Sequence, residues 1–318
     1  YQVSKIILES SNKLGMLPTL YNNLGSLYTH LGNYQKASTI LRKGISIAKA
    51  NSDDRMLSYL FATFGDLAYA LALYDIGLSY FKKAKRISGQ IGENYITTYS
   101  IINIARYYRQ DKNFVKSKEM LDEAKEYVSC QRPKHEYALW CNDYGLIMLS
   151  LGENRTGKEY LEIGISFLSC SYNPFDVAMA DIYKSLMHLI NKNWECSLEY
   201  ILKAASTISK LYTKTPFIPV LHEFWDELYS MTKSDNAIKH LDIFIKEYRK
   251  SLPTLRKNVF PEKKIVVNKE TKLEIIGFGR SRVLWDGKEL DNSDWIHQRA
   301  VRELFFYFLA QDRGLTKE

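Results

Sequence analysis

A small residue returns every 40 residues inside an apolar helical pattern, and this spacing limits the fold more than any other feature. The small residues are Gly25, Gly65, Ala105, Gly145 and Ser185. Three later positions of each segment keep the same period, namely Ala37, Gly77, Ser117, Gly157 and Ser197, then Leu41, Phe81, Leu121, Leu161 and Ile201, then Gly44, Ala84, Ala124, Gly164 and Ala204. The pattern predicts stacked pairs of helices in which the small residue lies where the second helix crosses the first.

Specific residues within this period carry a family resemblance. The segment Tyr21-Asn-Asn-Leu24-Gly25-Ser-Leu-Tyr28, followed by Tyr34 and Ala37, resembles the first-helix signature of tetratricopeptide repeats. The usual repeat of that family has about 34 residues, and the longer period resembles the array in MalT-like bacterial regulators. The resemblance implies a mainly α protein, a right-handed superhelical solenoid of helical hairpins with a period of about 40 residues.

The boundaries of the array are set by the same register. We expect a helical repeat domain over residues 1–250, with repeats starting near residues 18, 58, 98, 138, 178 and 218. Tyr1–Asn12 falls where the second helix of a preceding repeat would lie, which indicates a fragment of a longer protein. The sixth copy has Trp225 in the small-residue position and comes after Pro216 and Pro219, so we expect an atypical pair that closes the stack.

The distribution of charge separates the array from the C-terminal residues of the chain. The sequence has a formal net charge of +8, of which +4 lies in residues 251–272, a stretch that contains Pro253 and Pro261. Residues 1–250 carry +5 and residues 273–318 carry −1. We interpret residues 251–272 as a basic linker, which is either simply solvated or contacts a phosphate backbone or a partner.

After residue 272 the pattern changes from helical to alternating. The segment Leu273–Gly279 is typical of a strand that ends in glycines, and Arg282–Trp285 is typical of a second strand. Asp286-Gly287 is a tight-turn dipeptide that precedes Lys288–Leu290. A helix is predicted over about Trp295–Gln311. These residues indicate a small α+β piece over residues 273–318.

This piece resembles the opening of an OmpR-type winged helix, and most closely the version in SARP-type activators. The match is carried by Leu273, Ile275, Gly277, Phe278, Gly279, Val283, Asp286, Gly287, Lys288, Leu290, Trp295, Ala300, Leu304, Tyr307 and Leu309. In that family the third helix enters the DNA major groove, whereas this sequence ends after the first. The resemblance implies an incomplete winged helix, with DNA contacted only by residues beyond Glu318, where two more helices and a hairpin are expected.

Several classes of function are disfavoured by missing motifs. There is no P-loop, HExxH or GxSxG sequence, so we do not expect an enzyme or a cofactor. No two histidines lie three or four residues apart, and the four cysteines form no CxxC pair, so neither a metal site nor a disulfide framework is expected. No apolar run of about 18 residues and no secretory signal is visible, which favours a cytoplasmic protein without a membrane partner.

Candidate binding residues are expected on the inner wall of such a stack, which one face of each first helix lines. We predict a ligand or partner groove at Asn23, Tyr59, Thr63, Asp66, Tyr99, Asn103 and Arg106. Asn23, Asn103 and Arg106 would bond a ligand's backbone or carboxylate, and Tyr59 and Tyr99 would stack on it. The alternative is that these side chains form a solvated wall.

The two resemblances together suggest a function. In tetratricopeptide proteins the groove takes extended peptides or helices, and in MalT-like regulators the array receives the inducer. The two resemblances imply a sensor and relay fragment of a bacterial transcriptional regulator, whose groove takes a peptide, a small-molecule inducer or a protein. A missing upstream part would then be a nucleotide-hydrolysing switch domain. The alternative is a peptide- or protein-binding scaffold with no DNA role. The apolar face of the truncated C-terminal helix is expected to dock on the array, to pair with a second copy in a homodimer, or to leave the helix poorly ordered.

Overall fold

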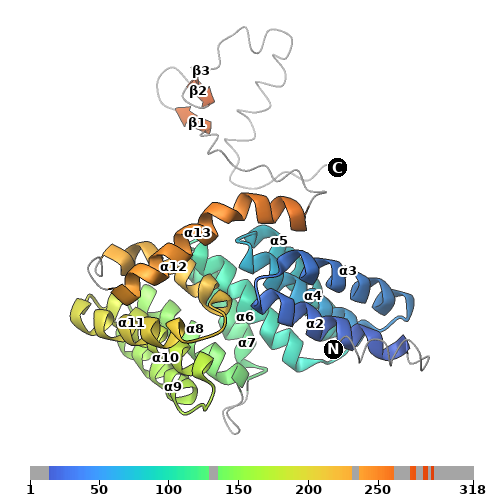
Figure 1. Ribbon diagram of the computed structural model, residues 1–318, viewed down its shortest axis with the longest axis horizontal. Coiled ribbons are helices and arrows are strands. Elements are labelled where there is room, and N and C mark those ends of the chain that lie inside the picture. The colour runs from blue at the N-terminus through green and yellow to red at the C-terminus, as the bar shows by residue number, and fades with distance from the viewer. Residues whose placement is uncertain are drawn as a thin grey trace. The chain divides into compact units, whose positions relative to one another are not determined.

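Helix pairs make up the larger of the two units into which the chain divides, Tyr1–Pro261 and Glu262–Glu318. The computed structural model describes residues 14–128, 135–230, 236–260, 273–276, 282–285 and 288–289. After the short 3₁₀ helix η1 (Leu14–Met16), the first helices of the pairs are α2 (Leu17–His30), α4 (Asp54–Ala70), α6 (Asn94–Gln110), α8 (His135–Ser150), α10 (Pro174–Ile190) and α12 (Ile218–Ser230). The second helices are α3 (Tyr34–Ala50), α5 (Tyr74–Gln90), α7 (Phe114–Lys125), α9 (Asn154–Ser169), α11 (Trp194–Ser209) and α13 (Asn236–Val259). The predicted helical solenoid is confirmed (Figure 1).

The small residues lie at the helix crossings, as the 40-residue period predicts. A methyl group at Gly25 would come within 2.3 Å of Leu41, and one at Gly65 within 2.8 Å of Phe81. In the fifth pair the small residue at the crossing is a serine. Its hydroxyl, Ser185 Oγ, donates to the carbonyl of Ser197 on the second helix at 2.8 Å. Each first helix therefore approaches its partner closely enough that a large side chain would separate them.

The turns inside the hairpins repeat with the same period. A residue with a left-handed backbone comes after the first helix at Gly32, Ala72, Lys112, Gly152 and Lys192, with φ between 50° and 87°. The next residue is an asparagine in three of these turns, Asn33, Asn113 and Asn193, and its side chain accepts a bond from a backbone amide of the second helix. The tight turn thus ends one helix and caps the next.

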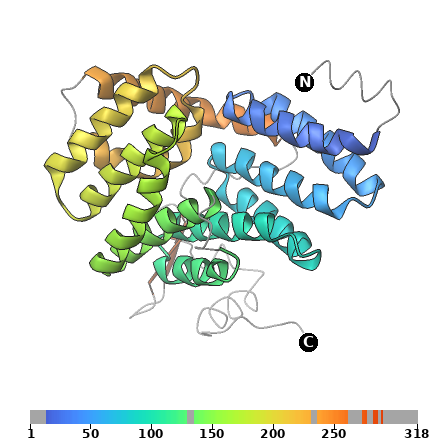
Figure 2. The ribbon, with the colours of Figure 1, turned by 90° about the horizontal axis from the view of Figure 1, so that it is seen from below.

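The last helix pair folds back on the beginning of the array. Helix α13 runs from beside α11 to α3 (Figure 1), and Figure 2 shows its far end behind the helices at the start of the array. The Tyr248 hydroxyl donates to the carbonyl of Ala70, and Arg256 Nε donates to the carbonyl of Leu71 at 2.7 Å. Trp225, at the predicted small-residue position, is buried and donates from Nε1 to Asp242 at 3.0 Å. The last pair therefore contacts α3 and α4 near the start of the array as well as α11 near its end.

The predicted linker begins later than expected. Helix α13 continues to Val259, so residues 251–259 are helical and Pro253 lies inside the helix. Leu252, Val259 and Phe260 are buried, and Phe260 packs on Phe64 with ring centroids 5.7 Å apart. This apolar packing outweighs the backbone hydrogen bond that proline removes. Residues 261–272 of the predicted linker lie outside the described residues.

The second unit contains the predicted strands. β1 (Leu273–Ile276) pairs antiparallel with β2 (Arg282–Trp285), which pairs with β3 (Lys288–Glu289). The expected helix over residues 295–311 lies outside the described residues. No helix in the described part of the chain is long and apolar enough to span a membrane.

The crossing geometry predicts opposite effects for two glycines. In Gly145→Ala the new methyl group would lie 2.7 Å from the carbonyl of Gly157 and 2.8 Å from the amide of Leu161. Because both are backbone atoms, α8 and α9 must separate, which should lower the free energy of unfolding by about 1–3 kcal/mol. Gly77→Ala meets nothing closer than 3.4 Å and should stabilise by about 0.5–1 kcal/mol through helix propensity. Denaturant unfolding followed by circular dichroism measures both, and equal effects would contradict this packing.

Candidate functional site

A cavity of about 380 Å³ lies on the inner side of the array. The first helices of the five regular pairs, α2, α4, α6, α8 and α10, contribute to its wall. The remaining wall comes from α12 and the short 3₁₀ helix η2 (Thr215–Phe217), through Pro216, Pro219, Val220 and Glu223. The fold-back of the last pair therefore adds a further wall to the groove, which becomes a partly enclosed pocket of a size typical of ligand sites.

Two arginines of α6, the half-buried Arg106 and the buried Arg109, form the charged wall of this cavity. Arg106 Nε donates to Asp143 Oδ2 at 2.8 Å. Arg109 Nη1 donates to Asp143 Oδ1 at 2.5 Å, and its other donors make two bonds to Glu223 at 2.7 and 2.8 Å. Burial would lower the pKa of Arg109, but Glu223 and Asp143 reverse this effect and raise it. Arg109 thus joins α6, α8 and α12 in one ionic network.

An acidic group stands beside this network on α4. Asp66 Oδ1 accepts a hydrogen bond from the Tyr99 hydroxyl at 2.8 Å. Burial raises the pKa of Asp66 from 3.8 to about 7, although the Tyr99 bond and the charge of Arg106 act in the opposite direction. The carboxyl group can therefore take up or release a proton near neutral pH.

Tyrosines supply most of the ring surface around the cavity. The ring of Tyr95 stacks between Tyr59 and Tyr99, with centroid distances of 6.1 and 6.4 Å. Tyr69 lines the cavity and is buried, and its hydroxyl has no hydrogen-bond partner among the described residues. A buried hydroxyl without a partner is costly unless a ligand atom bonds to it.

The predicted site residues divide into two groups. Asp66, Tyr99, Asn103 and Arg106 line the cavity, and Asn103 accepts from Arg106 at 3.2 Å and donates to the carbonyl of Tyr99 at 2.9 Å. The other three predicted residues, Asn23, Tyr59 and Thr63, are not among the lining residues.

These three residues occupy different surroundings. Asn23 is exposed on α2. Tyr59 packs on Tyr95, and Thr63 donates to Asn22 at 2.8 Å.

The sequence interpretation did not assign Tyr69, Arg109 and Glu223 to the site. Tyr69 and Arg109 lie three residues after Asp66 and Arg106, so they share the same helical face, and this spacing could have revealed them. Glu223 belongs to the atypical last pair, and no local signal indicates that this pair returns to the cavity.

The chemistry of the cavity favours a ligand with a positive charge. Arg106 and Arg109 are already paired with Asp143 and Glu223. Glu136, which also lines the cavity, makes no ion pair within the described residues. With Asp66 ionised, the cavity therefore has unpaired negative charge, tyrosine rings and one free hydroxyl. No group of three or more histidine, cysteine or acidic side chains suited to a metal ion occurs among the described residues.

Comparisons with known proteins agree with the helical-repeat fold. The tetratricopeptide repeat family model matches residues 18–51, which comprise most of α2 and all of α3. No curated protein matches the sequence.

Two solved structures are similar. One is the Rap conjugation gene regulator of the plasmid pLS20 in complex with the Phr* peptide, with a TM-score of 0.58 and 15% identity over 78% of this chain. This chain covers 66% of the length of that protein. The other is pilF of Pseudomonas aeruginosa, with a TM-score of 0.43 and 13% identity over 79% of this chain and 95% of that one. At 15% identity the likeness to the Rap regulator shows the fold alone.

The raised pKa of Asp66 predicts how stability depends on pH. The folded protein binds the Asp66 proton more tightly than the unfolded chain does, so this group makes stability fall as pH rises from about 4 to about 7, with no further change above. Asp66→Asn removes this titration. The variant should therefore gain stability relative to wild type across that range, as measured by urea unfolding at several pH values.

A surface aspartate provides the matched control. Asp75 accepts a hydrogen bond from the Tyr107 hydroxyl at 2.8 Å, but it is exposed. Asp75→Asn should leave the pH profile as in wild type. An unchanged profile in Asp66→Asn would contradict the burial of the Asp66 carboxyl group.

Proposed function

We propose that this chain is the ligand-receiving part of a bacterial transcription regulator, which binds a short peptide in the inner cavity and relays the event to its C-terminal module. The observation that carries the proposal is the inner cavity itself. Its wall combines the first helices of five pairs with α12, and Arg109 links these parts through Asp143 and Glu223. A ligand here contacts both ends of the array at once.

The proposed ligand class is a peptide with a cationic group, either a free amino terminus or a lysine or arginine side chain. Asp66 and Glu136 supply negative charge that no arginine of the cavity neutralises by a direct ion pair. The Tyr69 hydroxyl offers a bond to a peptide carbonyl. The Rap regulator, of similar fold, was solved with a peptide, which supports peptides as the class.

The relay in this proposal runs through α12 and α13. A ligand cation near Glu223 competes with Arg109, and a ligand that bonds both sides of the cavity holds α12 in place. Helix α13 extends to Val259 at the end of the first unit. Ligand binding thus changes the balance between two positions of the last pair, which is the requirement for a regulatory effect.

The DNA-binding part of the proposal rests on the sequence resemblance of residues 273–318 to the start of an OmpR-type winged helix. The antiparallel order β1-β2-β3 is compatible with the N-terminal sheet of that family. The competing function, a peptide-binding scaffold without a DNA role, shares the cavity and lacks the DNA-binding helices.

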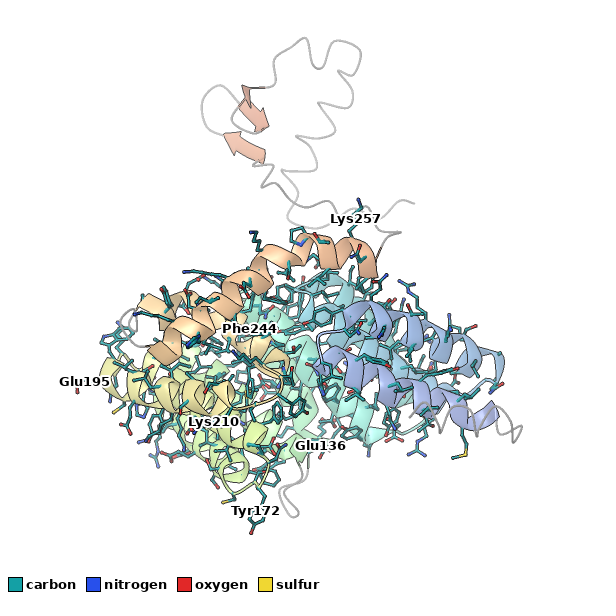
Figure 3. The ribbon with its side chains drawn as sticks, in the orientation of Figure 1. Glu136, Tyr172, Glu195, Lys210, Phe244 and Lys257 are labelled. Atoms are coloured by element: carbon teal, nitrogen blue, oxygen red, sulfur yellow. The ribbon has the colours of Figure 1, made fainter. Side chains whose placement is uncertain are left out.

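A peptide screen tests the cavity. A positional pentapeptide library with free amino termini is added to the full chain and binding is followed by thermal shift and fluorescence anisotropy. We expect the best pools to contain lysine or arginine together with an apolar residue. Tyr69→Phe, which removes only the unpartnered hydroxyl, should weaken the best peptide about 2–10-fold. Tyr172→Phe, at an exposed residue that does not line the cavity and points outward in Figure 3, should leave affinity unchanged.

Two results would reject parts of the proposal. Peptides whose affinity is the same in wild type, Tyr69→Phe and Asp66→Asn would show that binding occurs elsewhere. If the protein extended through the region after Glu318 bound no DNA with or without peptide, the scaffold function would replace the regulator.

A further inference from the structure

Two second helices near the start of the array, α3 and α5, are strongly basic. Helix α3 contains Lys36, Arg42, Lys43 and Lys49 and no acidic residue, and α5 contains Lys82, Lys83, Lys85 and Arg86 with only Asp75. The corresponding helices α7 and α9 are neutral and α11 is negative. The repeat register does not require this difference, because these basic residues, all exposed except the half-buried Lys85, do not form the helix crossings.

A groove of about 630 Å³ runs between these two helices, with α4 beneath it. Arg42 and Lys49 from α3 and Lys83 and Arg86 from α5 line it, and all four are exposed. No acidic residue lines the groove, and none of the four forms an ion pair within the described residues. The groove therefore holds four cations whose charges are not neutralised by neighbouring carboxylates.

The floor of the groove is apolar. Leu57, Phe61 and Ile87 are buried there with less than a tenth of their surface exposed, beside Phe64 and Tyr80. The rings of Phe64 and Tyr80 stack on each other at 4.6 Å, and Lys83 lies over Tyr80 at 5.1 Å. Apolar surface flanked by cations suits a partner that has both apolar side chains and negative charge.

We propose that this outer groove binds an acidic amphipathic helix of a partner protein. Charge complementarity selects the partner, and the two parallel ridges of α3 and α5 offer the groove into which a third helix fits. Arg42 and Lys49 are seven residues apart, about 10 Å along α3, so carboxylates two turns apart on the partner can face both. Leucine-like side chains on the same face would rest on Phe61 and Ile87.

A single-stranded nucleic acid fits the groove less well. Bases would need free aromatic faces for stacking, whereas Phe64 and Tyr80 use theirs on each other and on Arg42 and Lys83. Phe260 covers the edge of Phe64 as well. The rings can therefore contact aliphatic side chains of a partner, but they leave no free face on which a base could stack.

The groove also lies beside the last turn of α13. Arg42 Nη2 donates to the carbonyl of Val259 at 3.4 Å, and Ser38 Oγ donates to the same oxygen at 3.4 Å. A partner carboxylate that draws Arg42 away would remove one of these bonds. Binding in this groove can therefore affect the end of the first unit independently of the inner cavity and of the proposed function.

A designed peptide provides the probe. We use a fluorescein-labelled helix of about 18 residues, long enough to be partly helical, with glutamates flanking a leucine face. Fluorescence anisotropy compares it with a peptide of equal charge whose leucines are serine, and with a single-stranded DNA of equal charge. We expect the glutamate–leucine peptide to bind the full chain at least about tenfold more tightly than either, with affinity falling as salt rises.

Charge reversal locates the binding. Lys83→Glu/Arg86→Glu should weaken the glutamate–leucine peptide about tenfold or more. The matched control is Arg155→Glu/Lys158→Glu on α9, which reverses the same two residue types at the same spacing on another exposed second helix. Circular dichroism verifies that both variants are folded. Equal binding of the serine peptide or the DNA, no binding of the leucine peptide, or equal loss in both variants would overturn the proposal.

Discussion

The arrangement of this protein depends on one buried guanidinium group. Arg109 is 5% exposed and bonds simultaneously to Asp143, 1% exposed, and Glu223, 11% exposed. Two carboxylates and two arginines, Arg106 included, compensate one another where water is largely excluded, so removal of one partner would leave an uncompensated charge that costs about 3–5 kcal/mol. This network fixes α12 against the middle of the array, and α12 held there supplies one wall of the inner cavity.

The repeat and the closure have different physical origins. The crossings at Gly25, Gly65 and Ser185 are local, since each joins helices that are consecutive in the chain. The closure joins residues more than 100 positions apart, through Arg109 with Glu223 and Tyr248 with Ala70. The closure adds α12 to the wall of the inner cavity, whereas the basic outer groove is lined by α3, α4 and α5 alone.

The sequence was sufficient to predict the local part of this structure. A period of 40 residues located the helix pairs, because the small residues at each crossing are dictated by close approach of the backbones. The same period identified Asp66, Tyr99, Asn103 and Arg106, which line the cavity, since an inner face is set by helical spacing. It could not reveal Glu223, because the return of the last pair depends on contacts between distant segments. It also misplaced the start of the linker, because Pro253 is a strong local signal that the burial of Leu252 and Val259 overrides.

Hydrogen exchange in a Glu223→Gln variant tests the ionic closure most directly. Glutamine keeps the size of the side chain but removes the charge that Arg109 binds. The account predicts faster exchange of backbone amides in α12, in α13 and around Ala70–Ala72, with α9 to α11 unchanged, while Glu227→Gln one turn further on the exposed side of α12 behaves as wild type. Exchange that is unchanged in Glu223→Gln, or faster throughout the array, would contradict the claim that this ion pair holds α12 against the middle of the array.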